Sequence, residues 1–119
     1  MGKILIVDDA AFMRMLIKDT LTKNNYTNIV EAADGEAASV VYSKELPDLV
    51  FMDVTMPNKT GLEALADIRK LNPCAKVVMC SAMGQEGIVR DAISLGAVDF
   101  IVKPFKADRL LQVVRKYLG

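Results

Sequence analysis

Residues 49–57 read Leu-Val-Phe-Met-Asp-Val-Thr-Met-Pro, an apolar run that ends in a single carboxylate, Asp53. A bounded apolar run of this length is typical of a parallel strand that is buried on both faces. Pro57 cannot donate a ladder hydrogen bond and disfavours helix in the preceding residue, so the strand must end before it. The stretch therefore predicts a central strand with Asp53 at its carboxyl end, where open α/β sheets place their chemistry.

The same alternation of strand and helix runs through the whole chain. Strands are expected at residues 3–7, 27–33, 49–53, 76–80 and 98–102. Apolar residues at helical spacing follow each strand, between Asp9 and Asn24, after Gly35, from Gly61 to Asn72, from Gly84 to Leu95 and from Ala107 to Leu118. On the first helix this spacing leaves Arg14 and Lys18 facing outward. Because parallel strands need right-handed crossovers, the pattern predicts an α/β fold of the flavodoxin-like, doubly wound kind, with five parallel strands in the order 2-1-3-4-5 and five helices.

Composition narrows the class of protein. The chain has 119 residues, 52% of them apolar, which predicts one domain spanning residues 1–119. The formal net charge is +0, and no apolar stretch approaches membrane-spanning length, so we expect neither a nucleic-acid nor a membrane partner. With no histidine and two cysteines, the chain lacks the commonest general base and the usual zinc ligand set. We expect a reduced, cytoplasmic, monomeric protein.

Polar residues end four of the predicted strands at one edge of the sheet. Asp8-Asp9 follow the first strand and would lie beside Asp53, because the first and third strands are neighbours in this order. Ser81 and Lys103 follow the fourth and fifth strands and would arrive from the other side. Taken singly, each has a simpler interpretation as a turn, cap or solvated residue. Their convergence predicts a site.

Three carboxylates, a hydroxyl and a lysine at one edge favour metal-assisted phosphoryl chemistry. Clustered carboxylates repel one another unless a cation is present. Mg²⁺ prefers such hard oxygen ligands and is held by a few carboxylates together with phosphate. A carboxylate such as Asp53 could then attack phosphorus and form an aspartyl phosphate. The Lys103 ammonium would offset the charge of the phosphoryl oxygens, and the Ser81 hydroxyl could donate a hydrogen bond to one of them.

Asp8-Asp9, Asp53, Ser81 and Lys103-Pro104, each after a strand, resemble the signature set of response-regulator receiver domains, and the match covers the whole chain. The segments IVDDAAFMR, CSAMGQ and FIVKPF are most similar to stand-alone chemotaxis regulators within that family. The resemblance implies a two-component signalling protein that accepts a phosphoryl group and assists its own phosphorylation and dephosphorylation. It does not imply a turnover enzyme.

The resemblance also implies roles for the acidic residues. Asp53 would be the phosphoacceptor. Asp9 and Asp53 would bind Mg²⁺ directly, together with the backbone carbonyl of Thr55, and Asp8 would act mainly through a metal-bound water.

Further roles follow from the same resemblance. Lys103 would pair with the phosphoryl group, and the Lys103–Pro104 bond would be cis. Thr55 and Met83 would flank the approach of the water that hydrolyses the phosphoaspartate. Ser81 would be coupled to Phe100, an aromatic residue that swings inward when the hydroxyl moves; an ordinary core aromatic is the alternative interpretation of Phe100.

For partners, the resemblance implies the histidine kinase CheA, the flagellar motor switch protein and a phosphoaspartate phosphatase. The output face would comprise the fourth helix, the fifth strand and the fifth helix. The chain ends soon after the last predicted helix, so we expect no attached output domain, although a receiver belonging to a longer transcription factor is an alternative.

Three other functions compete with the chemotaxis interpretation. A stand-alone phosphorelay receiver of the sporulation type would carry the same site and hand its phosphoryl group to another histidine. An aspartyl-phosphate phosphatase of the haloacid dehalogenase type normally needs a second aspartate two residues after the nucleophile, where this chain has Thr55. Flavodoxin-type electron transfer needs a phosphate-binding loop after the first strand, where Asp8-Asp9 would repel the FMN phosphate.

Overall fold

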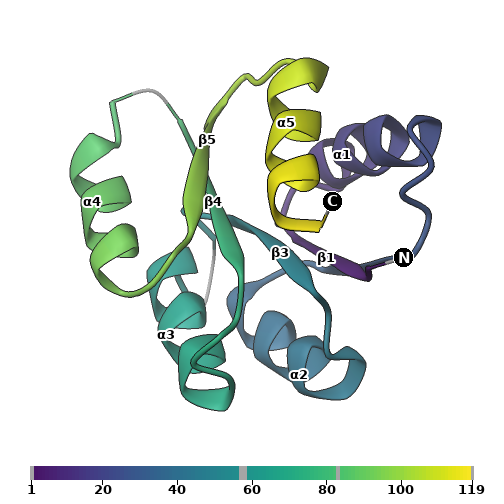
Figure 1. Cartoon of the computed structure of the whole chain (residues 1–119). Helices are drawn as coiled ribbons and strands as arrows, with labels where there is room; N and C mark the ends of the chain where they lie inside the picture. Colours follow the sequence, from purple (N-terminus) through teal and green to yellow (C-terminus); the bar gives the residue numbers. More distant parts are fainter. Residues whose placement is uncertain (1, 57–58, 83, 119) are drawn as a thin grey trace.

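The computed structural model of the chain describes residues 2–56, 59–82 and 84–118. Strands and helices alternate along these residues (Figure 1). The strands are β1 (Ile4–Val7), β2 (Ile29–Ala32), β3 (Leu49–Asp53), β4 (Val77–Ala82) and β5 (Asp99–Lys103). The helices are α1 (Ala11–Lys23), α2 (Gly35–Glu45), α3 (Gly61–Leu71), α4 (Glu86–Ser94) and α5 (Ala107–Leu118).

The strands form one parallel sheet in the order β2-β1-β3-β4-β5, which confirms the predicted topology. Central β3 lies between β1 and β4, with Asp53 paired to Cys80 in register. Because all the pairings are parallel, the strands end at one edge of the sheet, where the strand order makes the ends of β1 and β4 the neighbours of the end of β3.

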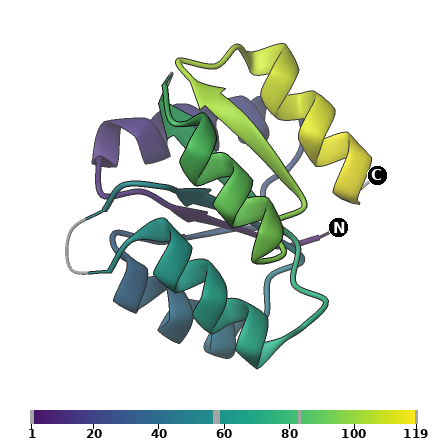
Figure 2. The same ribbon diagram turned by 90° about the vertical axis from the view of Figure 1, so that its left-hand side faces the viewer.

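Helices cover both faces of the sheet. Figure 2 shows α1 and α5 above the sheet and α2 and α3 below it. Ile6 and Phe51 pack with residues of α1 and α5 on one face, whereas Leu5 and Met52 pack with residues of α2, α3 and α4 on the other. Because neighbouring strand residues point to opposite faces, a strand buried on both sides needs a continuous apolar run. This requirement explains the sequence of β3, which is buried throughout.

Local sequence signals fix several helix ends. Thr60 and Glu63 form a capping box at the start of α3, and Asp34 accepts a hydrogen bond from the Ala37 N–H at the start of α2. After α4, Gly96 has a φ of 105°, a conformation that glycine adopts without steric cost. These signals determine where α2 and α3 begin and where α4 ends.

β4 and β5 extend beyond the ends predicted for them. Ser81 pairs with Val102, and Ala82 pairs with Lys103. The apolar runs stop at residues 80 and 102, but the backbone pairing of β4 with β5 does not depend on apolar side chains and continues past them. Ser81 and Lys103 are therefore part of the paired strands, which restrains their backbones.

Within the described residues, no helix combines the length and apolar character that crossing a membrane requires.

Candidate functional site

Three aspartates meet where β1 and β3 end. Asp53 is the last residue of β3 and is 8% exposed, and Asp8, directly after β1, is 2% exposed. Asp9 is exposed beside them. One carboxylate oxygen from each lies within 4.8 Å of the others. The structure thus brings together the acidic residues predicted from the sequence.

Lys103 connects two of these carboxylates. Its Nζ lies 2.9 Å from Asp8 Oδ2 and 3.0 Å from Asp53 Oδ1, and its side chain is 19% exposed. The peptide bond from Lys103 to Pro104 is cis, as predicted. A cation at this point balances part of the charge that the buried carboxylates would otherwise leave uncompensated.

Burial and the ion pairs act in opposite directions on these groups. Burial raises the pKa of the Asp53 carboxyl above its ordinary value, while the hydrogen bond and charge of Lys103 oppose that rise. Burial alone would lower the pKa of the Lys103 ammonium, but its hydrogen bonds to Asp8 and Asp53 outweigh this effect and leave the pKa raised. Lys103 is therefore a permanent cation at neutral pH.

The loop after β1 is held by side chains on both sides. Asp8 Oδ1 accepts a hydrogen bond from the Ala10 N–H at 2.9 Å, so Asp8 stabilises the turn rather than capping α1. Arg14, predicted to face outward, turns back: its Nη1 donates to the Asp8 carbonyl at 2.6 Å and its Nε to Glu31 at 3.1 Å. Arg14 thereby fixes the backbone that carries Asp8 and Asp9.

The start of α3 lies directly against the backbone of Asp53. The Gly61 N–H donates to the Val54 carbonyl at 2.9 Å. A Cβ at residue 61 would collide with the Asp53 carbonyl oxygen and would lie 2.9 Å from the Val54 Cα. Only glycine allows this approach, which makes the position of Asp53 depend on α3.

The donor set fits a hard divalent cation. Three carboxylates within reach of one another supply oxygen ligands, which Mg²⁺ prefers over nitrogen or sulfur. Asp9 is exposed whereas Asp8 and Asp53 are buried, so the group of carboxylates meets solvent on the Asp9 side. The buried Cys80 thiol is not part of this donor group.

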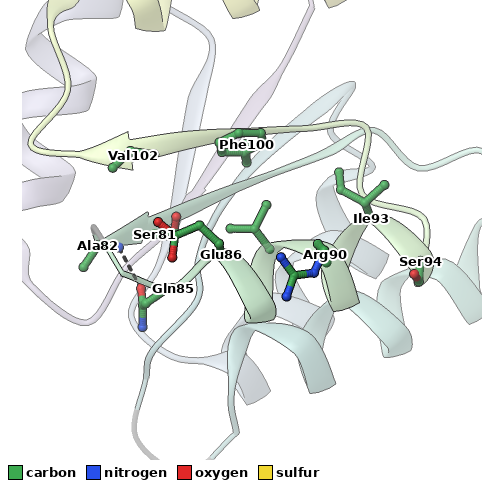
Figure 3. Close-up of a pocket in the computed structure, with 10 residues that line it drawn as sticks. Ser81, Ala82, Gln85, Glu86, Arg90, Ile93, Ser94, Phe100 and Val102 are labelled. Carbon is green, nitrogen blue, oxygen red and sulfur yellow. Dashed lines mark hydrogen bonds between the residues drawn. The ribbon is translucent and has the colours of Figure 1, made fainter.

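Ser81 and Phe100, the predicted switch residues, line one groove between α4 and β5 (Figure 3). The groove encloses about 670 Å³. Ser81 in the groove lining is 2% exposed, whereas Phe100 on β5 is 38% exposed. Phe100 is therefore not an ordinary core aromatic, because β5 is an edge strand that the helices cover incompletely.

Thr55 is joined to the β4 end by Gln85. The Gln85 Nε2 donates to Thr55 Oγ1 at 3.3 Å, and Gln85 Oε1 accepts from the Ala82 N–H at 2.7 Å. Met83, predicted to flank the site with Thr55, lies outside the described residues.

Arg14 and Gln85 are the site residues that the sequence patterns do not reveal. Arg14 has the spacing of a solvated helix residue. Gln85 occupies the N-cap of α4, where Ser, Thr, Asp or Asn is favoured, and makes no capping hydrogen bond. The unusual N-cap residue is the one signal that could have pointed to Gln85.

Comparisons with known proteins agree with this geometry. Residues 4–115 match the model of the response regulator receiver domain. Over 117 residues the chain is 54% identical to Chemotaxis protein CheY of Bacillus subtilis, covering 98% of each. It is 53% identical over 119 residues to Protein CcdB of the same organism, covering 100% of this chain and 99% of the relative. Sporulation initiation phosphotransferase F of B. subtilis is 34% identical over 116 residues, covering 98% and 93%.

Solved structures show the same fold. The receiver domain of NtrX from Brucella abortus superposes with a TM-score of 0.92 at 37% identity, covering 98% of each chain. A CheX-CheY-BeF3-Mg+2 complex from Borrelia burgdorferi contains a chain that superposes with a TM-score of 0.91 at 36% identity, covering 99% of this chain and 90% of that one.

Proposed function

Because the chain belongs to the response-regulator receiver family, we propose that residues 1–119 form a receiver domain in which Asp53 accepts a phosphoryl group. The observation that carries the proposal is the Lys103 ammonium, 3.0 Å from Asp53 Oδ1 at the end of β3. A fixed cation beside the acceptor oxygen stabilises the charge of an incoming phosphoryl group.

In the proposed reaction, an Asp53 carboxylate oxygen attacks the phosphorus of a phosphohistidine on a histidine kinase. The new O–P bond forms as the P–N bond breaks, and the electron pair of that bond stays on the departing imidazole. With acetyl phosphate as donor, a P–O bond breaks instead and acetate leaves. Attack of water on the aspartyl phosphate later returns the carboxylate and inorganic phosphate, so the protein is altered and restored rather than acting as a turnover enzyme.

The neighbouring residues have distinct proposed roles. Mg²⁺, when bound, would supply positive charge for the carboxylates and the phosphoryl oxygens. We assign its direct ligands to Asp9, Asp53 and the backbone carbonyl of Thr55, with Asp8 acting through water. The Lys103 ammonium would bind a phosphoryl oxygen on the side away from the metal ion.

Ser81 and Phe100 are proposed to pass the signal to the output face. The Ser81 hydroxyl would move to donate to a phosphoryl oxygen, and the space it leaves would admit the Phe100 ring, which lines the same groove. Phosphorylation would thus shift an equilibrium of the surface formed by α4, β5 and α5. Thr55 and Met83 would tune the lifetime of the phosphoaspartate.

We place this receiver in bacterial chemotaxis, as a cytoplasmic monomer phosphorylated by the kinase CheA. The phosphorylated form would bind the flagellar motor switch protein and would be dephosphorylated by a phosphatase. The likeness to chemotaxis proteins supports this choice. A phosphorelay role is the second candidate, supported by the more distant likeness to the sporulation phosphotransferase.

Intact-mass measurement of phosphoryl incorporation from acetyl phosphate tests the chemistry. We expect a labile gain of one phosphoryl group that requires Mg²⁺ and is absent from Asp53→Asn. Asp19→Asn, at an exposed position of α1, should be labelled like wild type. Equal labelling of Asp53→Asn, or no adduct in wild type, would refute the proposed mechanism. Binding of the phosphorylated protein to the purified motor switch protein then separates chemotaxis from a phosphorelay.

A further inference from the structure

The last backbone hydrogen bond that a regular parallel ladder would form between β3 and β4 is missing. The Val54 N–H donates to the Cys80 carbonyl at 3.0 Å, and a regular parallel ladder would continue from the Ala82 N–H to the Val54 carbonyl. That carbonyl instead accepts from the Gly61 N–H. The Ala82 N–H therefore faces the space beyond the end of β3, and Gln85 Oε1 accepts its hydrogen bond at 2.7 Å (Figure 3).

The orientation of the Gln85 carboxamide is determined by its partners. A backbone N–H can only donate, so the carbonyl oxygen of Gln85 must face Ala82 and its NH₂ group is left to donate to Thr55 Oγ1. Gln85 is the N-cap residue of α4 but makes no side-chain capping hydrogen bond. Its side chain thus binds Ala82 and Thr55 beside the site and does not cap the helix.

We propose that Gln85 is a positioning residue that occupies the Ala82 N–H in the unphosphorylated protein and thereby opposes phosphorylation of Asp53. This inference rests on the proposed function. A phosphoryl group on Asp53 would extend past the end of β3, toward the space that the Ala82 N–H faces. Its charged oxygens accept hydrogen bonds more strongly than a neutral carboxamide. Phosphorylation then exchanges one acceptor of the Ala82 N–H for another and displaces the Gln85 side chain.

The displacement also reaches the groove between α4 and β5. Gln85 lines that groove together with Ser81 and Phe100. Release of its carboxamide would change the lining of the groove, so the residue that opposes phosphorylation would also transmit it to the face formed by α4 and β5.

Binding of beryllofluoride with Mg²⁺, a non-covalent mimic of the phosphoryl group, tests this role by calorimetric titration. Gln85→Ala leaves the Ala82 N–H free for the mimic, and we expect binding to tighten by roughly two- to tenfold, the size of one net hydrogen bond. Gln85→Glu keeps an acceptor for Ala82 and adds a negative charge, so its binding should be weaker than that of wild type. Gln112→Ala, an exposed glutamine on α5, is the matched control and should bind like wild type.

Hydrogen exchange of the Ala82 amide in the metal-free protein gives an independent readout. The amide should exchange faster in Gln85→Ala than in wild type or Gln112→Ala. Unchanged or weakened mimic binding by Gln85→Ala, or unchanged Ala82 exchange, would overturn this inference alone. A wild-type protein that takes up neither beryllofluoride nor a phosphoryl group would overturn the proposed function and this inference with it.

Discussion

The ammonium nitrogen of Lys103 lies 3.0 Å from Oδ1 of Asp53, a residue 50 positions earlier in the chain. The ladder from β3 through β4 to β5 fixes both backbones, so the pair is set by strand register.

Removing the cation should destabilise the protein. Lys103→Met leaves the buried Asp8 and Asp53 carboxylates without their partner, and we expect the free energy of unfolding to fall by about 2–4 kcal/mol in metal-free buffer at neutral pH. Lys106→Met, an exposed lysine three residues on, is the control and should change stability by less than about 0.5 kcal/mol. Urea unfolding measures both, and equal losses in the two variants would mean that the ion pair contributes nothing specific.

The buried Asp53 carboxyl should produce a characteristic pH dependence. Because burial raises its pKa in the folded state, the folded protein binds a proton that the unfolded chain has lost, and Asp53 becomes progressively destabilising as pH rises from 3.8 through the raised pKa. Asp53→Asn lacks this titration, so its unfolding free energy should rise relative to wild type across that window.

Urea unfolding with a chelator between about pH 4 and about pH 7 measures the difference. Asp19→Asn, at an exposed position, serves as the control. A difference between Asp53→Asn and wild type that does not vary with pH would contradict the raised pKa.

Arg14 should matter for metal affinity. Its hydrogen bond to the Asp8 carbonyl restrains the loop that carries Asp8 and Asp9, so Arg14→Ala should weaken Mg²⁺ binding by roughly two- to tenfold. Lys18→Ala removes another cation beside Glu31 without touching that carbonyl and should leave the affinity unchanged. Calorimetric titration distinguishes the two, and a similar loss in both would indicate a general charge effect instead.

Neighbouring residues on β5 should respond very differently to truncation. Ile101 is fully buried, and Ile101→Ala should lower the unfolding free energy by about 2–5 kcal/mol. Phe100 is 38% exposed in the groove, so Phe100→Ala should cost less than about 1.5 kcal/mol despite the larger side chain. Comparable losses in chemical denaturation would place the Phe100 ring in the core.

A methyl group at residue 61 should disturb Asp53. Gly61→Ala forces α3 away from the Asp53 carbonyl, and we expect a loss of about 1–3 kcal/mol in unfolding free energy and slower phosphoryl uptake. Gly87→Ala, in α4, meets only the Arg90 Nη2 at 3.8 Å and should be neutral or stabilising by up to about 1 kcal/mol. Wild-type phosphorylation kinetics in Gly61→Ala would show that Asp53 tolerates the shift.

The fold and the main site residues are predictable from sequence because they follow from strong local signals. Continuous apolar runs require strands buried on both faces, and the parallel topology brings Asp8, Asp53, Ser81 and Lys103 to one edge. The ion pairs of Lys103 are not predicted by these signals, because the resemblance to receiver domains pairs Lys103 with a phosphoryl group. In the structure it already pairs with Asp8 and Asp53.

The contacts that the sequence patterns do not predict are made by side chains that reach back across a turn to the backbone of a strand end. Arg14 looks solvated by helical spacing, yet the path of β1 places the Asp8 carbonyl within its reach. Gln85 reaches back to Ala82 only because β3 leaves the sheet after Asp53. No periodicity encodes such contacts.

The lysine between the carboxylates has a consequence for how the protein is maintained in a cell. Three carboxylates alone would make assembly of this edge depend on dissolved cations, as in small domains that fold only with their metal. Lys103 supplies an internal counter-charge, so we expect the chain to reach its native state without a bound ion. For the proposed receiver function, we then expect magnesium supply to govern phosphorylation of the protein, and to leave its abundance and its resistance to proteolysis largely unchanged.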